Sequence, residues 1–481
     1  MKKEANYEKE LDPSIKEARM RRGKDVNISL FDLDPKYYNL GAGKKYMIKT
    51  YGCQGNLADS EHLAGILELM GFEATDDELK ADFVLFNTCA IRENAEERVF
   101  GEIGRFEKFR KKNPKMLIGV CGCMPQEEKT ILKIKKTFPY INIVFGTHNI
   151  SSLPAYIYDA VKNQKNTIEV FSVEGGIDEG LPVKRESKYK AWVNIMYGCD
   201  EFCTYCIVPY TRGKERSRRP EAIIEEVKTL AKEGYKEVTL LGQNVNAYGK
   251  DFTDIDFTFG DLLVELNKID IPRIRFTTSH PRDLDDKTID AMALGGNIMP
   301  HLHLPVQSGN DEVLKKMNRK YTREEYLLKV KKLKEKIPGI SITTDIIVAF
   351  PTETRSEFED TLSLVKEVEF EGAYTFIFSP REGTPAFSYE NNLSEEEKKN
   401  RLLELNDLIN SYFLKGRQRF EGQIVEVLVD GPSKNNPNML TGYTKHNMLV
   451  NFEGPDVHEG DIINLKITKA FSWHMLGEII K

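Results

Sequence analysis

The amino-acid sequence predicts an α/β protein with three folded parts: an N-terminal parallel α/β domain, a central open partial (β/α)6 barrel and a small C-terminal β-barrel. Short apolar runs alternate with helical patterns from residue 44 to about residue 415, which predicts the first two parts. Several short alternating strands separated by Gly-Pro and Gly-Asp turns follow, which predicts the third. A chain of 481 residues is long enough for two or three domains.

The composition is typical of a soluble globular protein. Hydrophobic residues make up 40% of the chain and charged residues 30%. No stretch reaches the roughly 18 apolar residues of a membrane span, and the charged residues 1–24 are not typical of a secretory signal. Seven is an odd number of cysteines, which favours reduced thiols used as ligands over disulfides. We therefore expect a cytoplasmic protein without a membrane partner.

The N-terminal part begins with residues 1–43, which are polar and charged without a clear period, and we expect them to form a flexible extension. The N-terminal domain, residues 44–165, then repeats a strand followed by a helix. Strands are predicted over 46–51, 82–87, 116–120 and 141–145, and helices over 57–70, 94–109 and from Pro125 onward. Such alternation implies a parallel sheet with helices on both faces.

Three cysteines follow the first three of these strands. Cys53, Cys89 and Cys123 each lie just past a strand, beside a glycine or a polar residue. The carboxyl ends of parallel strands meet at one edge of a sheet, so these thiols are expected to converge, one ligand short of a closed iron–sulfur cluster. Three buried core cysteines are the alternative interpretation. Cys121 lies inside the third strand and is predicted to belong to the core.

The central domain, residues 185–415, contains six further strand–helix units. Its strands are predicted over 192–196, 237–241, 273–278, 301–304, 340–348 and 374–378. Six parallel units form an open partial barrel, and ligands bind such barrels at the carboxyl ends of the strands. Polar residues at these ends are candidate cofactor contacts, with ordinary loop polarity as the alternative. They are Gln243, Asn244, Ser279, Gln307 and Arg381.

The loop after the first of these strands contains Cys199, Cys203 and Cys206 at C-x3-C-x2-C spacing. Thiolates this close can ligate three irons of a cubane 4Fe-4S cluster and leave the fourth iron open. A structural zinc site needs four ligands, and no fourth Cys or His lies close in sequence. The spacing resembles that of the radical S-adenosylmethionine enzymes, in which the open iron chelates S-adenosylmethionine and one electron cleaves it to a 5′-deoxyadenosyl radical.

A basic run follows the cysteine loop, with five cations against one anion between residues 211 and 220. The net charge of −6 argues against a globally basic nucleic-acid binder, but a local run beside a redox cluster can contact phosphates. A solvated charged loop is the alternative. The candidate phosphate contacts are Arg212, Lys214, Arg216, Arg218 and Arg219.

The C-terminal segment, residues 416–481, is predicted to contain strands over 424–429, 448–452 and 461–467. Strands this short and closely spaced indicate a small closed β-barrel. Such barrels often bind RNA, although an oligomerisation or packing module fits the same pattern.

Taken together, these motifs resemble the methylthiotransferases, radical enzymes with two iron–sulfur clusters, over roughly residues 44–481. The matching runs are 51–53, 87–96, 122–126, 198–218, 304–309 and 379–386. The run Asn-Thr-Cys-Ala-Ile-Arg-Glu-Asn-Ala-Glu at 87–96 is similar to the branch that modifies N6-isopentenyladenosine beside the tRNA anticodon, at position 37. The branches that act on threonylcarbamoyladenosine or on a ribosomal-protein aspartate look different after that cysteine and are the alternative.

The resemblance implies two 4Fe-4S clusters, an auxiliary one on Cys53, Cys89 and Cys123 and a radical one on the cysteines of the 199–206 loop. It implies transfer of a methylthio group to C2 of the adenine with two S-adenosylmethionine molecules, which makes the five strand-end residues candidate contacts of that cofactor. Adenine C2 is unactivated, which explains the need for a radical cofactor. The implied partners are the tRNA anticodon stem-loop, a reduced flavodoxin- or ferredoxin-type electron donor and a sulfur source. The C-terminal barrel looks like a TRAM domain.

One motif departs from the family pattern, because the usual Gly-Phe-Pro-Gly-Glu-Thr is here Ala349-Phe350-Pro351-Thr352-Glu353-Thr354. If either replaced glycine requires positive φ, the loop after the fifth barrel strand must differ. Two other functions compete with the methylthiotransferase interpretation: a radical enzyme whose second cluster only carries electrons, and a non-catalytic RNA-binding protein with structural zinc. An open iron argues against the first, since pure electron carriers normally have four protein ligands.

Overall fold

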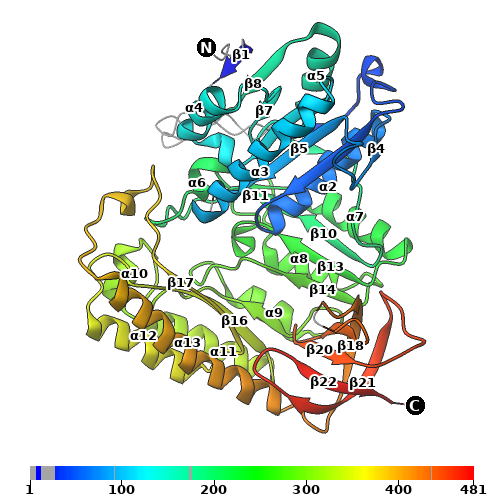
Figure 1. Cartoon of the computed structure of the whole chain (residues 1–481). Helices are drawn as coiled ribbons and strands as arrows, with labels where there is room; N and C mark the ends of the chain where they lie inside the picture. Colours follow the sequence, from blue (N-terminus) through cyan, green and yellow to red (C-terminus); the bar gives the residue numbers. More distant parts are fainter. Residues whose placement is uncertain (1–6, 12–27, 91–92, 173–175, 435, 481) are drawn as a thin grey trace. The chain divides into compact units, whose positions relative to one another are not determined.

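The computed structural model describes residues 7–11, 28–90, 93–172, 176–434 and 436–480 (Figure 1). It divides into two compact units. The first comprises 1–186, 197–200 and 206–218, and the second comprises 187–196, 201–205 and 219–481. The cysteine loop is therefore divided, with Cys199 and Cys206 in the first unit and Cys203 in the second. In the part of the chain that is described, no helix is both long and apolar enough to cross a membrane.

The first unit is built on a seven-stranded parallel sheet with the order β1-β8-β7-β6-β5-β3-β4. Four of its strands confirm the four that the sequence predicts, namely β3 (Lys45–Thr50), β5 (Phe83–Thr88), β6 (Leu117–Gly122) and β7 (Ile143–Phe145). The sequence did not predict β1 (Tyr7–Leu11), β4 (Glu73–Ala74) or β8 (Asn166–Glu169).

Helices cover both faces of this sheet because successive side chains of a strand point to opposite faces. Val84 and Phe86 of β5 pack with residues of α3 and α4, whereas Phe83 and Leu85 pack with residues of α2 and α5. Cys121 of β6 is buried in the second of these cores, as predicted. The four helices are α2 (Gln54–Leu69), α3 (Glu93–Lys112), α4 (Glu128–Thr137) and α5 (Leu153–Tyr158).

The N-terminal segment differs from the prediction of a flexible extension over residues 1–43. Strand β1 pairs with β8, and β2 (Ile28–Leu30) pairs with β9 (Ile177–Glu179). Leu33 and Leu40 are buried in the same core as the apolar side of α2. The described residues of this segment are therefore part of the fold; residues 1–6 and 12–27 lie outside the described residues.

The helix predicted from Pro125 also differs. Pro125 lies in a 3-10 turn, η2 (Met124–Gln126), and α4 begins only at Glu128. The extended backbone of Glu127, with φ −103° and ψ 124°, separates the two. Further short turns of this unit are η1 (Pro35–Tyr37), η3 (Ile150–Ser152) and the π-turn η4 (Asp159–Asn163), and the basic run lies around α6 (Val208–Thr211) and β12 (Arg216–Ser217).

The second unit contains six parallel strands in two sheets, β10-β13-β14 and β15-β16-β17, which confirms the predicted open barrel. A parallel bridge joins Ile274 of β14 to Ile298, just before β15. The strands are β10 (Lys190–Asn194), β13 (Glu237–Leu241), β14 (Arg273–Phe276), β15 (His301–His303), β16 (Ser341–Val348) and β17 (Gly372–Ile377). The short strand β11 (Met196–Tyr197) leads into the cysteine loop.

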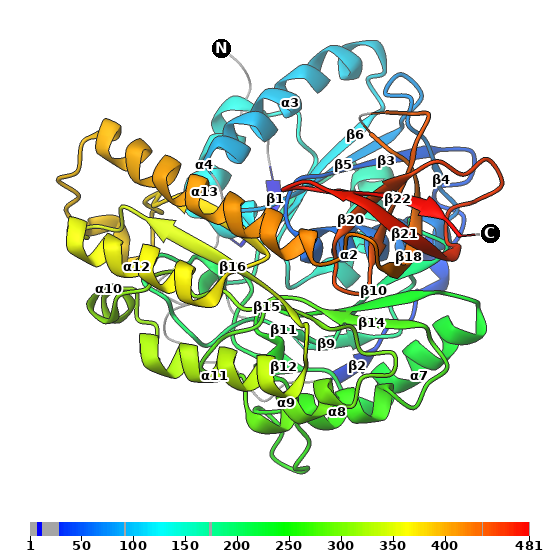
Figure 2. The same ribbon diagram turned by 90° about the horizontal axis from the view of Figure 1, so that it is seen from below.

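Helices α8, α9, α11 and α12 lie along the outer side of these strands (Figure 2). The helices of the second unit are α7 (Pro220–Lys232), α8 (Phe259–Leu266), α9 (Asp286–Ala293), α10 (Asp311–Lys316), α11 (Arg323–Lys336), α12 (Arg355–Val368) and α13 (Glu395–Gln418). Two 3-10 turns, η5 (Val245–Ala247) and η6 (Pro385–Ser388), follow β13 and β17.

The C-terminal residues form the predicted closed barrel, with the strand order β18-β19-β20-β22-β21. Val427, Val450 and Leu465 are among the side chains of its small core. Its strands are β18 (Ile424–Pro432), β19 (Leu440–Thr444), β20 (Leu449–Phe452), β21 (Ile462–Ala470) and β22 (Met475–Ile479). Of these, β19 and β22 were not predicted.

Candidate cluster and cofactor sites

The segments that follow β3, β5 and β6 are joined by a set of hydrogen bonds within the first unit. The backbone N–H of Cys123 donates to the carbonyl of Thr88 at 2.7 Å. The buried amide of Asn56 donates to that carbonyl and to Oδ1 of Asn87, both at 3.2 Å. Asn56 Oδ1 also accepts from the backbone N–H of Cys53 at 3.4 Å. These bonds link the three strand ends that carry the first three-cysteine site.

Two glycines allow these segments to approach closely. A Cβ at Gly52 would lie 2.8 Å from Cβ of Cys89, and a Cβ at Gly122 would lie 2.3 Å from the carbonyl of Thr88. Gly122 also has φ 95°, a conformation that glycine adopts without steric penalty. A residue larger than glycine therefore has no room at position 52 or 122. The two glycines allow the backbones of Cys53 and Cys123, which follow them, to lie this close to residues 88 and 89.

A buried guanidinium lies beside these thiols. Arg212 forms an ion pair with Asp59 of α2 at 2.7 Å and a hydrogen bond with Cys123. A hydrogen bond with Cys89, together with the charge of Arg212, lowers the pKa of the Cys53 thiol to about 5 although desolvation raises it. Burial raises the pKa of Cys123. Three close thiols with a compensating cation fit an iron–sulfur cluster, because clusters bind thiolates and carry negative charge.

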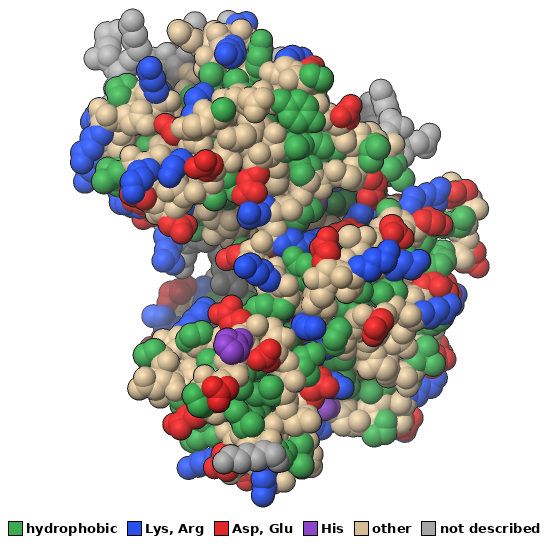
Figure 3. Space-filling view, turned by 90° about the vertical axis from the view of Figure 1, so that its right-hand side faces the viewer, with side chains coloured by type: hydrophobic (Ala, Val, Ile, Leu, Met, Phe, Trp, Pro, Cys, Tyr) green, Lys and Arg blue, Asp and Glu red, His purple; other side chains and the backbone are tan. Residues whose placement is uncertain are grey.

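The basic run is more buried than a phosphate-binding segment needs. Arg212 and Arg216 are only 6% and 5% exposed, so both side chains are buried. Their side chains are used inside the first unit. The phosphate role of the five cations stays a prediction. Arg218 and Arg219 form ion pairs with acidic residues, Glu179 at 2.6 Å and Asp254 at 3.0 Å, and Lys214 is half-buried. On the face in Figure 3, basic and acidic side chains are interspersed.

In the first unit, residues of the basic run accept hydrogen bonds from the backbone of the cysteine loop. The backbone N–H of Cys199 donates to the carbonyl of Gly213 at 3.0 Å. The backbone N–H of Asp200 donates to Oε1 of Glu215 at 3.2 Å. Cys199 is buried and Cys206 is half-buried.

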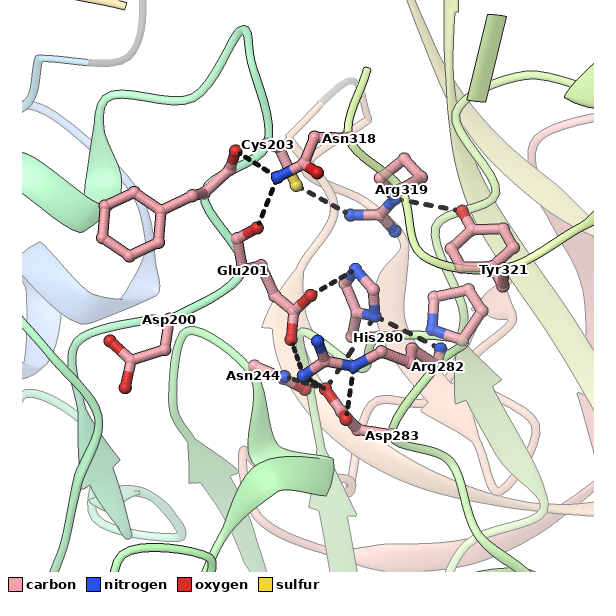
Figure 4. Close-up of polar contacts among 12 residues, drawn as sticks. Asp200, Glu201, Cys203, Asn244, His280, Arg282, Asp283, Asn318, Arg319 and Tyr321 are labelled. Carbon is pink, nitrogen blue, oxygen red and sulfur yellow. Dashed lines mark hydrogen bonds and ion pairs between the residues drawn. The ribbon is translucent and has the colours of Figure 1, made fainter. Parts of the chain in front are cut away.

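In the second unit, the C-terminal end of α10 holds residues 201–205 of the loop (Figure 4). The backbone N–H and Oγ1 of Thr204 donate to the carbonyls of Met317 at 3.0 Å and Lys316 at 2.9 Å. The side-chain amide of Asn318 donates to the carbonyls of Glu201 at 3.3 Å and Phe202 at 2.9 Å. The next residue, Arg319, donates to Sγ of Cys203 at 3.4 Å.

A second network lies beneath this loop. Glu201, which is 2% exposed, forms an ion pair with Arg282 and lies 3.5 Å from Nε2 of His280 (Figure 4). Hydrogen bonds from Arg282 and Lys250 hold the pKa of Asp283 below its usual value although desolvation opposes them. Glu201, His280 and Asp283 offer atoms within 4.8 Å of one another, as metal ligands do. The two cations already balance both carboxylates, so the network supports the loop and has no need of an ion.

The five predicted cofactor contacts lie at the carboxyl ends of the barrel strands of the second unit. Four of them are buried and Gln243 is half-buried. Among the described residues, Oδ1 of Asn244 and Oγ of Ser279 are buried without a hydrogen-bond partner. Buried polar atoms rarely lack a partner, so these two atoms fit a polar ligand. Gln307 has φ 69°, and its backbone N–H donates to the carbonyl of Asp345 at 2.9 Å.

Several residues around the sites were missed by sequence reasoning. Asn56 lies three residues after Cys53 and Asp59 three residues after Asn56, a helical spacing that is a local signal for both. Arg319 lies 116 residues from Cys203, and no local pattern relates it to the cysteine loop. The missed residues are Asn56, Asn318 and Arg319, which contact a cysteine or its loop, Asp59, which pairs with Arg212, and Glu201, which lies in the loop and pairs with Arg282.

Comparison with known families gives three matches along the chain. Residues 45–146 match the Uncharacterized protein family UPF0004, residues 193–365 the Radical SAM superfamily and residues 418–480 the TRAM domain. Of the motif at 87–96, residues 91–92 lie outside the described residues. A solved structure of the radical S-adenosylmethionine methyltransferase TsrM from Kitasatospora setae has the same fold over 72% of this chain and 77% of its own, with a TM-score of 0.51 and 14% identity.

The barrel and the C-x3-C-x2-C loop thus define a radical S-adenosylmethionine enzyme, a class that uses a 4Fe-4S cluster and S-adenosylmethionine. Three similar curated proteins are named tRNA-2-methylthio-N(6)-dimethylallyladenosine synthase. The protein of Anoxybacillus flavithermus is 57% identical, and the match covers 98% of this chain and 89% of that protein. The protein of Bacillus subtilis is 56% identical, with 97% of this chain and 92% of that protein covered. The protein of Bacillus cytotoxicus is 55% identical, with 100% of this chain and 96% of that protein covered. The chain belongs to this family of tRNA methylthiotransferases.

Proposed function

We propose that this chain transfers a methylthio group to C2 of N6-isopentenyladenosine (dimethylallyladenosine) beside the tRNA anticodon, at position 37. The observation that carries the proposal is the first three-cysteine site, where the segments of Cys53, Cys89 and Cys123 meet around Arg212. A radical enzyme that only abstracts hydrogen needs no such second site. The names of the relatives support the substrate.

The proposal includes two 4Fe-4S clusters. Cys53, Cys89 and Cys123 would ligate the auxiliary cluster, and Cys199, Cys203 and Cys206 the radical cluster. When bound, the clusters and two S-adenosylmethionine molecules supply a methylated sulfur and a radical that removes hydrogen from C2. Arg212 offsets negative charge at the auxiliary site, and the buried polar atoms of Asn244 and Ser279 orient the cofactor.

Two partners besides the tRNA, and the cytoplasm as the location, belong to this function. A reduced flavodoxin- or ferredoxin-type protein supplies electrons, and a sulfur source replaces the sulfur that is transferred. The reaction takes place in the cytoplasm, where reduced thiols persist. The tRNA presents a single-stranded anticodon loop, so its base can leave the stack and reach the end of the barrel.

The first experiment measures iron and sulfide per chain after anaerobic reconstitution, for the wild type and for Cys53→Ala/Cys89→Ala/Cys123→Ala. We expect about eight irons in the wild type and about four in the variant, because each cubane holds four. Nucleoside mass spectrometry of tRNA then follows the methylthio product, which the variant should not form. About four irons in both proteins would overturn the sulfur-transfer proposal and leave a radical enzyme with another product.

The phosphate contacts are tested with the three cations that are not fully buried. We expect Lys214→Ala/Arg218→Ala/Arg219→Ala to weaken tRNA binding and to lower the slope of log K against log salt. The slope falls because a protein with fewer phosphate contacts releases fewer counterions from the tRNA when it binds. The matched control is Lys228→Ala/Lys232→Ala, which removes exposed lysines from α7. An unchanged affinity at every salt concentration would exclude the phosphate role.

A further inference from the structure

Arg319 is a buried cation at the cysteine loop. It is 7% exposed and follows the left-handed residue Asn318, whose φ is 57°, at the end of α10. Its guanidinium donates to Sγ of Cys203 at 3.4 Å, to the hydroxyl of Tyr321 at 3.0 Å and to the carbonyl of Pro305 at 3.0 Å (Figure 4). Three bonds in different directions fix the plane of the guanidinium with one edge toward the sulfur.

The charge of Arg319 is not balanced by a carboxylate. Among the residues that the structure describes, Arg319 forms no ion pair with Asp or Glu, and its acceptors are a thiol, a phenol and a carbonyl. The neighbouring Arg282 differs, because it pairs with both Glu201 and Asp283. An unpaired buried charge is strongly unfavourable, so the site around Arg319 calls for an anion. Cys203 is the position at which an anionic cluster would be bound.

A hydrogen bond to a cluster sulfur changes how readily the cluster accepts an electron. A positive donor lowers the energy of the state with more negative charge, which is the reduced state. Removal of Arg319 would therefore make reduction of the cluster harder. Arg319 contacts Cys203 of the second unit, whereas Arg212 contacts Cys123 of the first unit. The effects of the two arginines can therefore be measured separately.

We propose that Arg319 is a positioning residue that sets the reduction potential of the radical cluster through its hydrogen bond to Cys203. The cluster takes one electron from a reduced flavodoxin- or ferredoxin-type donor, and Arg319 stabilises the product of that transfer. This inference rests on the radical cluster of the proposed function and is independent of the methylthio transfer.

The test is a redox titration followed by electron paramagnetic resonance, in the full chain carrying Cys53→Ala/Cys89→Ala/Cys123→Ala so that only the loop cluster responds. We expect Arg319→Met to lower the ratio of reduced to oxidised cluster about tenfold at a fixed potential, a shift of about 59 mV for one electron. Arg319→Lys keeps the charge but loses the planar fork, so its shift should be smaller and of the same sign. Lys268→Met, which removes an exposed cation that pairs with Glu265 on α8, should leave the potential unchanged.

The iron content of each variant is measured together with its titration, to show that the cluster is present. Arg319→Met with about four irons per chain and an unchanged potential would overturn the proposal. If that variant fails to hold iron, Arg319→Lys decides, because a wild-type potential in the lysine variant also overturns it. The methylthio product is assayed separately in the chain with all six cluster cysteines and Arg319 intact. Its absence there would count against the proposed function, whereas the shift in potential of Arg319→Met would still decide the role of Arg319.

Discussion

At the scale of single residues, the loop after β16 keeps a glycine-like backbone without glycine. Ala349 and Thr352 have φ of 57° and 68°, at the two positions where the family pattern has glycine. The backbone N–H of Ala349 donates to the carboxylate of Glu353 at 2.7 Å, and its carbonyl accepts from Asn391 at 3.0 Å. Left-handed backbone costs an L-residue about 1–2 kcal/mol, so the surrounding bonds hold the loop against this strain. The replaced glycines therefore do not force a different loop conformation.

We predict that Thr352→Gly raises the free energy of unfolding by about 1 kcal/mol, because glycine tolerates positive φ and the exposed threonine side chain buries nothing. Urea denaturation of the holoenzyme measures the change. Thr253 is also exposed and has no positive φ, so Thr253→Gly is the matched control and should lower stability. A destabilised Thr352→Gly would show that the loop is held by the threonine itself.

At the scale of elements, α10 acts through its C-terminal end. The residues that follow the helix, Asn318 and Arg319, reach the cysteine loop by three contacts with its carbonyls and sulfur, and Thr204 of the loop adds two bonds to the end of the helix. Asparagine suits this position because it adopts positive φ more readily than other non-glycine residues. The helix thus supplies a rigid support for a loop that has no helix or strand of its own between residues 201 and 205.

We predict that Asn318→Ala speeds the loss of iron from the loop cluster to a chelator several-fold, since two hydrogen bonds of about 1 kcal/mol each are removed and positive φ is strained. Asn318→Gly removes the same bonds without the strain and should lie between the wild type and the alanine variant. Decay of the visible absorption under anaerobic chelation gives the rates. Equal rates in all three proteins would mean that the thiolates alone hold the loop.

The sequence predicted the elements whose pattern is local and missed those that depend on neighbours. Strands β3, β5 and β6 are apolar runs, and the three cysteines after them could be assigned because parallel strands end at one edge. Asn166–Glu169 is half polar and becomes β8 only by pairing with β7 and β1. The role of Arg319 could not be predicted from the sequence, because its contact with Cys203 joins segments 116 residues apart.

At the scale of the whole molecule, two arginines attach the C-terminal barrel to the catalytic barrel within the second unit. Arg273 of β14 is fully buried and donates to Oε1 of Glu426 at 3.0 Å and to the carbonyl of Tyr443 at 2.8 Å. Arg275 donates to the carbonyl of Thr444 at 2.7 Å. Burial lowers the pKa of Arg273, the direction expected for a cation removed from water. The joint fixes β18 and β19 against the edge strand β14.

We predict that Arg273→Met/Arg275→Met destabilises the protein by about 3 kcal/mol or more, because the buried carboxylate of Glu237 and the half-buried carboxylate of Glu426 lose their partners. It should also weaken tRNA binding while iron content stays at the wild-type value. Differential scanning calorimetry, a tRNA binding assay and iron analysis give the three readings. Arg419→Met, which breaks a partly exposed pair with Glu371, is the control and should cost less than about 1 kcal/mol. Full tRNA affinity in the double variant would show that the joint is dispensable for the substrate.

Most acceptors at this joint are main-chain carbonyls, those of Tyr443, Thr444 and Lys445. A carbonyl is present whatever residue stands at the position, so the attachment does not depend on the side chains of Tyr443 or Lys445. The side chains of residues 443–445 at the end of β19 can therefore change during evolution, and the ligand preference of the barrel with them. The barrel would remain attached at the same place.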